Sequence, residues 1–267
     1  MTPMELALYI FEMTLVGIGV GLISGALGLG GGILMVPAFV TFQAGMDVHT
    51  AKGTSLFIII FVSLLNAWRH NRGLPDKPWR LAAYLAAGSI VGSYLGAWVT
   101  TMVTETMVIG VFMVLLGILA FRTFLLTPRE VHEDEVRKRR VITVLIGLTA
   151  GFFGGATGTG GGAVLIPLAL MAGIMTNDRA VGLSNMVMVA TSFAGTLAHL
   201  RAEEIYVHAW TYGHVYLGLV PLVFIGSQIG SPLGKNLNHH LTLPRRRVLM
   251  GGLLLIIAVR LLWRLTA

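Results

Sequence analysis

Two glycine clusters are the residues of this sequence whose type and spacing point most directly to chemistry. Residues 28–32 read Gly-Leu-Gly-Gly-Gly and residues 158–162 read Gly-Thr-Gly-Gly-Gly, each within an apolar run. Each glycine costs a helix about 1 kcal/mol relative to alanine, so four in five residues favour a break. A helix that begins after such a break presents unpaired N–H groups and the positive end of its dipole, which attract anions. The clusters therefore predict an anion site with backbone donors at Gly28, Gly30, Gly31, Gly158, Gly160 and Gly161.

Uncharged polar side chains near the clusters could complete this site. The apolar runs contain no Lys or Arg well inside them apart from Arg260, so the site is expected to rely on hydroxyl and amide groups. The predicted side-chain ligands are Thr54, Ser55, Thr157, Thr159, Ser184 and Asn185.

The alternative role for these glycines is close helix packing, which small residues commonly allow in membranes. We assign that role to glycines that recur at four-residue spacing outside the clusters, where packing alone explains the pattern. These are Gly88, Gly92, Gly96, Gly226, Gly230 and Gly234.

Three titratable residues could carry a coupling proton, namely Glu12, His70 and His199. Glu12 lies six residues into the first apolar segment, and the two histidines lie at the ends of apolar segments. The alternative for all three is an ordinary side chain that reaches the membrane surface. Asn66 is predicted to bridge helices by hydrogen bonds.

The remaining polar residues do not indicate catalysis. No nucleophile–base pair stands out, and four other histidines have no metal-ligand spacing with carboxylates. The chain is therefore predicted to be no enzyme and to hold no metal or cofactor. Those histidines are His208, His214, His239 and His240.

The elements that position these residues are membrane helices. Of the 267 residues, 55% are hydrophobic and 12% are charged, and the mean hydropathy is +0.80. A soluble domain carries about 25% charged residues, so a soluble enzyme or a disordered chain is excluded. Only helices and closed barrels satisfy all their backbone hydrogen bonds in lipid, and the sequence has no alternating pattern of barrel strands. The predicted fold class is therefore all-α and polytopic, with about eight to ten apolar helical segments. The segments are 6–27, 33–45, 54–68, 81–101, 107–126, 141–157, 163–175, 183–198, 211–233 and 247–263.

Basic residues between the segments predict the orientation. The loops 69–80, 122–140 and 235–247, together with Arg179, hold 15 of the 19 Lys and Arg residues, and such loops face the cytoplasm. The basic residues reflect this orientation and do not indicate a nucleic-acid partner. The predicted organisation is membrane repeat 1 over 6–126, a cytoplasmic linker over 127–140 and membrane repeat 2 over 141–263.

An internal duplication divides the chain into two halves. Residues 21–37 read GLISGALGLGGGILMVP and residues 151–167 read GFFGGATGTGGGAVLIP, which are identical at eight of seventeen positions. The match continues with His70 and His199 at equivalent places. Each half holds five segments, so the second half begins on the opposite side of the membrane. Inverted repeats of this kind are common in transporters, with the substrate at the interface of the halves.

The paired motifs GALGLGGGILMVP (25–37) and GATGTGGGAVLIP (155–167) resemble the sulfite exporter TauE/SafE family. The stretches AKGTS (51–55) and AVGLSN (180–185) are similar to a second patch of that family in each half. The resemblance implies a multi-pass transporter of sulfur-containing anions, such as sulfite and organosulfonates, in the cytoplasmic membrane. A homo-oligomer and coupling to a proton or sodium gradient are both compatible with the resemblance.

The leading hypothesis is a secondary transporter in which the two breaks bind a small anion and the halves rock to alternate access. An anion channel shares the repeat architecture. The third hypothesis is an accessory membrane subunit that transports nothing alone.

Overall fold

The computed structural model describes residues 3–27, 31–43, 45–74, 77–125, 136, 139–203, 206, 209–240, 248, 252, 255 and 259. Nearly all of these residues are helical. Six of the described helices are long and apolar enough to cross a membrane, so the chain is an all-α, multi-pass membrane protein. The helices are α1 (Pro3–Leu27), α2 (Gly32–Phe42), α3 (Val48–Asn71), α4 (Trp79–Thr101), α5 (Glu105–Leu125), α6 (Arg140–Thr157), α7 (Gly162–Met171), α8 (Asn177–Leu200) and α9 (Val220–His240).

Most of the predicted segments correspond to single helices, and three differ in extent. Helix α8 begins at Asn177, six residues before the expected start at Leu183. Helix α3 begins at Val48, six residues before the expected start at Thr54, because Asp47 caps it by accepting bonds from the N–H groups of His49 and Thr50. The segment predicted over 211–233 is wrong at its start. There the chain forms a hairpin of β1 (Thr211–Tyr212) and β2 (Val215–Tyr216), then a 3₁₀ turn, before α9. Segment 247–263 lies largely outside the described residues.

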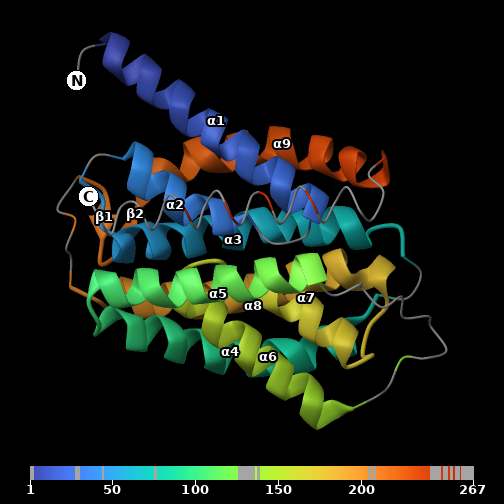
Figure 1. Ribbon diagram of the computed structural model, residues 1–267. Helices are drawn as coiled ribbons and strands as arrows, with labels where there is room; N and C mark the ends of the chain where they lie inside the picture. The colour runs from blue at the N-terminus through green and yellow to red at the C-terminus, as the bar shows by residue number, and fades with distance from the viewer. Residues whose placement is uncertain are drawn as a thin grey trace.

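The helices form two bundles, and each mixes segments from both halves of the sequence. The first bundle contains α1, α2, α3 and α9, and the second contains α4, α6, α7 and α8 (Figure 1). Within them α1 packs along α9 and α4 packs along α6, while α3 of the first bundle lies against α8 of the second. Helices α3 and α8, which carry many of the buried polar side chains, therefore occupy the centre of the molecule.

Close packing of the two outer pairs depends on glycines at four-residue spacing. A Cβ at Gly88, Gly92 or Gly96 would overlap backbone oxygens of α6, and one at Gly226, Gly230 or Gly234 would overlap those of α1. The packing role predicted for these six glycines is confirmed. Such close backbone approach replaces the hydrophobic effect, which lipid does not supply between helices.

The short helices α2 and α7 do not cross the hydrocarbon core. With 11 and 10 residues at 1.5 Å each, they span roughly 15 Å, about half of the hydrocarbon core. Arg140 at the start of α6 and Ile174 after α7 line the same pocket. On the opposite side, Gln43 after α2 donates a hydrogen bond to the hydroxyl of Tyr206, just before the hairpin. The pair α6–α7 therefore turns back toward the end at which α6 begins. That the two pairs enter the membrane from opposite sides stays a prediction.

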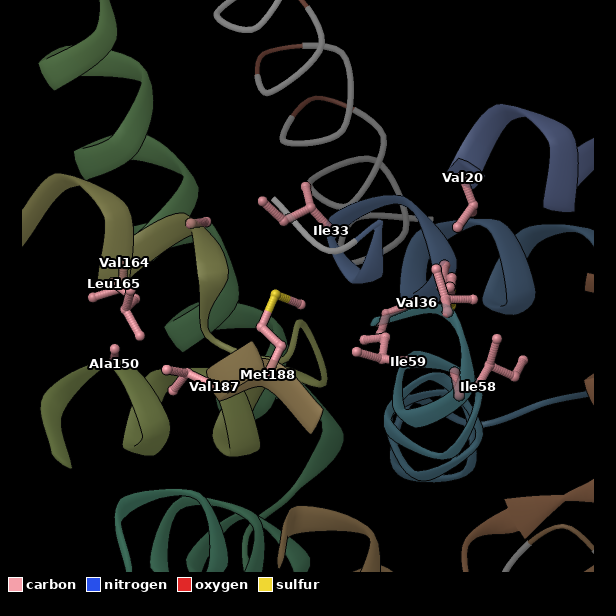
Figure 2. Packing of buried hydrophobic residues seen from close by; sticks show 14 of the residues in the cluster. Val20, Ile33, Val36, Ile58, Ile59, Ala150, Val164, Leu165, Val187 and Met188 are labelled. Atoms are coloured by element: carbon pink, nitrogen blue, oxygen red, sulfur yellow. The ribbon is translucent and has the colours of Figure 1, made fainter. Parts of the chain in front are cut away.

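Buried aliphatic side chains hold the bundles together around these helix pairs. Figure 2 shows Ala150, Val164, Leu165 and Val187 of the second bundle on one side and residues of the first bundle on the other, all within one buried cluster. The labelled residues of the first bundle are Val20, Ile33, Val36, Ile58 and Ile59.

The glycine stripe of α4 yields a stability prediction. Gly92→Ala places a methyl group on the carbonyl oxygen of Leu148, so α4 and α6 must separate. We expect a loss of about 1–3 kcal/mol, as overpacking usually costs. The control is Gly19→Ala in α1, where a Cβ meets nothing within 4 Å. Thermal unfolding of the detergent-purified protein measures both, and equal midpoints for the two variants would contradict the packing role of Gly92.

Candidate anion-binding site

The start of α2 lies inside the protein against the break between α6 and α7. An ideal Cβ at Gly32, the first residue of α2, would lie 2.6 Å from Cα of Thr159 and 2.9 Å from the carbonyl oxygen of Gly158. Residues 28–30 lie outside the described part, so the places of Gly28 and Gly30 are untested. The structure thus brings the start of α2 against the break between α6 and α7, as the duplicated clusters predicted.

Each short helix begins at a glycine that leaves its first N–H groups without a side-chain cap. Gly31 has φ of 67° and Gly161 has φ of 82°, which is the left-handed region that favours glycine. At neither helix start does an N–H group donate a hydrogen bond to a capping side chain. Both starts are buried, so water does not replace the missing cap from bulk solvent.

The carbonyl groups on the other side of the second break are satisfied by α3. The Ser55 hydroxyl donates to the Gly158 oxygen at 2.8 Å, and the Lys52 ammonium donates to the Ala156 oxygen at 3.2 Å. The oxygens at the end of α6 therefore have partners, whereas the first N–H groups of α7 have no side-chain cap. Hydrogen-bond donors remain at this break, and donors suit an anion.

Lys52 corrects the expectation that no Lys or Arg lies well inside the apolar segments apart from Arg260. It is fully buried in the first turns of α3, and its ammonium also donates to the Thr100 hydroxyl of α4 at 2.8 Å. Its aliphatic part lies against Gly158, where a Cβ would come within 3.0 Å of Lys52 Cγ. The sequence analysis missed it because Lys52 precedes the apolar run of α3 and falls within the helix only through the Asp47 cap.

The other predicted hydroxyl and amide ligands lie in different places. Thr157 and Thr159 lie at the second break, with their hydroxyls 3.0 Å apart. Thr54 instead contacts the hairpin, where its hydroxyl accepts a bond from the N–H of Tyr216 at 2.9 Å. Ser184 and Asn185 are fully buried in α8. Whether any of them binds a ligand stays a prediction.

Several buried polar atoms of α8 have no hydrogen-bond partner among the described residues. They include Ser184 Oγ, Asn185 Oδ1 and Ser192 Oγ. Ser192 Oγ lies 3.1 Å from where a Cβ of Gly160 would stand, so it points at the second break. Ser192 was not among the predicted ligands, although it aligns with Ser63 in the repeat. Buried polar groups without partners are rare, and a ligand in the break would satisfy this one.

A cluster of histidines lies beside Lys52 at the start of α3. His199 is fully buried, and its Nδ1 lies 3.3 Å from Nδ1 of His214 in the hairpin. The ring of His49 lies 5.5 Å from that of His214. His199 is therefore enclosed by protein, and both its coupling role and its alternative place at the membrane boundary stay predictions. His70, the equivalent position in the repeat, is half-buried one residue before the end of α3, so the two histidines have different environments.

The hairpin histidine is disposed to stay neutral. Burial lowers the pKa of His214 below its ordinary value, Asp47 opposes this shift, and Lys52 adds to it. A hydrogen bond between two Nδ1 atoms needs one proton, so one of the two rings donates its Nδ1–H to the Nδ1 of the other. Within the described residues, no group of three or more His, Cys, Asp or Glu side chains is arranged to hold a metal ion.

The other predicted polar residues are also accounted for. Asn66 bridges helices as expected, since it donates to the Ser24 hydroxyl of α1 and accepts from the Ser231 hydroxyl of α9. Glu12 lies half-buried in the middle of α1, away from the described breaks. The two hydrogen bonds of Asn66 tie α1, α3 and α9 into one unit.

Comparisons with known proteins agree with this architecture. The family described as sulfite exporter TauE/SafE matches residues 13–261. A probable membrane transporter protein of Methanocaldococcus jannaschii is 27% identical, with 94% of each chain covered. The probable membrane transporter protein YunE of Bacillus subtilis is 24% identical, and the alignment covers 84% of this chain and 88% of YunE. A probable membrane transporter protein of Xylella fastidiosa is 25% identical, and the alignment covers 99% of this chain and 97% of that protein. No solved structure matches the chain significantly.

The match spans both glycine clusters, all nine described helices from Met13 onward and the linker between the halves. The relatives are named as transporters and not as enzymes. The chain therefore belongs to the sulfite exporter TauE/SafE family.

Proposed function

We propose that this protein is a secondary transporter that moves a small anion, a sulfur oxyanion or an organosulfonate, across the cytoplasmic membrane. The observation that carries the proposal is the contact of the start of α2 with the second break, beside the buried cation Lys52. The uncapped N–H groups of α2 and α7 supply fixed donors, and Lys52 supplies positive charge in a medium of low dielectric constant. Family membership supports the class of substrate.

Alternating access follows from the arrangement of the bundles. Hydrogen bonds such as those of Asn66 tie α1, α3 and α9 together, and Ser93 of α4 donates to the Thr191 oxygen of α8 at 2.7 Å within the second bundle. The anion site lies between the bundles. The bodies that rock are therefore these two bundles, each of which contains helices of both repeats, rather than the halves of the sequence.

Proton coupling is carried by His199 in this mechanism. The groups that face it are His49 and Lys52 of α3 and His214 of the hairpin, with Asp47 at the start of α3 acting on His214. Loss or gain of one proton at the His199–His214 pair changes the charge next to Lys52, and so changes the affinity of the neighbouring break for an anion.

An anion channel and an accessory subunit are the competing functions. Purified protein in liposomes separates them. Flux that saturates and runs uphill on a proton or sodium gradient contradicts a channel, and any anion flux by the pure chain contradicts an accessory subunit.

The charge of Lys52 gives the first prediction for the site. Thermal stability of the purified protein is measured against sulfite, sulfate, thiosulfate, sulfoacetate, taurine and simple carboxylates. We expect stabilisation by sulfur anions of about 2.7 kcal/mol at one hundred times the dissociation constant. In Lys52→Met we expect that stabilisation to disappear, while the unliganded protein stays folded because methionine fills similar space.

The matched control is Lys235→Met. Lys235 is partly buried and donates to the Arg69 carbonyl oxygen, and it lies far along the chain from either break. Lys235→Met should retain the anion response. Loss of the response in both variants, or in neither, would contradict the role of Lys52.

The second break gives the next prediction. Gly160→Leu should abolish transport while membrane insertion stays intact, because a side chain there meets Met188, Ile59 and Ser192 at the break. Gly45→Leu is the control, since Gly45 has nearly the same φ, +75° against +76°, but only Tyr206 at 4.0 Å. Anion flux into liposomes is the measurement. Equal flux in the two variants would show that backbone strain alone explains the defect.

Coupling through His199 is tested by its removal. His199→Gln should lose uphill anion accumulation driven by a proton gradient and keep anion counterflow, which needs no net proton movement. His70→Gln is the control from the equivalent position of the repeat. If proton-driven accumulation survives in His199→Gln, His199 does not carry the coupling proton, and a sodium gradient becomes the driving force to test.

A further inference from the structure

A basic pocket lies at the end of the molecule where α4, α6 and α8 begin. It has a volume of about 1140 Å³. Its described lining contains five basic residues and no acidic one, and the basic residues come from three separate stretches of the chain: Lys77, Arg80, Arg139, Arg140 and Arg179. Among the described residues, the first four form no ion pair with a carboxylate. Asp178 lies next to Arg179 in sequence but does not line the pocket.

Three helix starts add to the positive potential of this pocket. The residues before α4 and α6 are Pro78 and Arg139, which line it, and the residue before α8 is Thr176, which lines an adjoining pocket that shares Arg179. None of the three helices has a side-chain cap. Cations at the positive ends of helix dipoles repel them, so this arrangement is unfavourable until an anion enters.

The pocket is also placed at a membrane boundary. It includes the first residues of α4 and α6, both of which are long and apolar enough to cross a membrane. Trp79 is 64% exposed and Tyr84 is 37% exposed on its rim, as is typical of aromatic residues at lipid headgroup level. Leu81, Ala83 and Ile174 give its remaining lining an apolar character that suits an acyl chain.

We propose that this pocket binds the phosphate group of an anionic membrane lipid, with Arg80, Arg139 and Arg140 as its principal ligands. Arginine presents planar paired donors to phosphate oxygens, and the apolar lining holds the start of the lipid tail. The lipid ties the beginnings of α4, α6 and α8 together at the end of the second bundle. Basic pockets between membrane helices on the cytoplasmic side bind lipid headgroups in this manner.

The experiment measures lipid bound to the full-length protein. Purified protein in neutral detergent is titrated with phosphatidylglycerol or with phosphatidylcholine, and bound lipid is counted by native mass spectrometry. We expect phosphatidylglycerol to bind in preference to phosphatidylcholine. The triple variant R80Q/R139Q/R140Q should weaken phosphatidylglycerol binding by about a hundredfold, since each cation contributes about fivefold near anionic lipid.

The control variant is R72Q/R201Q, which removes two exposed arginines outside the pocket, and it should bind phosphatidylglycerol as the unaltered protein does. Competition by inorganic phosphate on the unaltered protein needs no variant and tests the source of the anion. Phosphate is added at roughly 10 mM, the millimolar range in which weak soluble ligands bind. If the lipid stays bound at this concentration, the result supports a lipid site. Displacement at that concentration, or equal lipid binding by the triple variant and the control, would overturn the proposal.

Discussion

Broken helices are tolerated at membrane depth only when protein surrounds the exposed backbone groups, and this constraint shapes the rest of the molecule. The breaks before α2 and α7 lie against α3 and α8, which are the most enclosed of the long helices. Side chains of α3 then take up the free carbonyl oxygens, through Ser55 on Gly158 and Lys52 on Ala156. The N–H groups at the start of α7 receive no such side chain. The fold thereby satisfies acceptors internally and leaves donors for a ligand.

The crossed packing of the halves follows from the same constraint. Each helix that leads into a break, α1 or α6, is held by a glycine-bearing helix from the other half, α9 or α4. Close backbone contact fixes the angle at which the helix pair enters, and it does so over several turns from Gly88 to Gly96 and from Gly226 to Gly234. In the proposed mechanism, motion concentrates at the α3–α8 interface, where the two bundles meet and where the second break, Lys52 and the histidines lie. The inverted relation of the halves remains a prediction that this exchange of partners supports.

Much of this architecture could be predicted from the sequence because its signals are local. Glycine density located both breaks, and four-residue spacing located the packing stripes. Lys52 and Ser192 could not be found in this way, since their roles depend on which helix faces a break, which no spacing within one segment reveals. The contact of Thr54 with the hairpin could not be found for the same reason, because its partner Tyr216 lies far along the chain. The hairpin could not be predicted because its second strand, Val215–Tyr216, runs directly into the apolar sequence of α9.

The position of Lys52 also bears on how an empty carrier returns. The hydrogen bonds of a charged Lys52 go to the neutral acceptors Thr100 and Ala156, so an empty site leaves a buried positive charge with no direct ion pair among the described residues. Moving one elementary charge through the membrane field costs about 2.3 kcal/mol per 100 mV, so the empty state resists reorientation. A bound monovalent anion removes that cost, whereas a proton passed from Lys52 to the neighbouring His199–His214 pair would leave the same positive charge inside the site. In the proposed mechanism, anion exchange therefore needs no proton release, whereas return of the empty carrier requires a proton to leave the site for solvent.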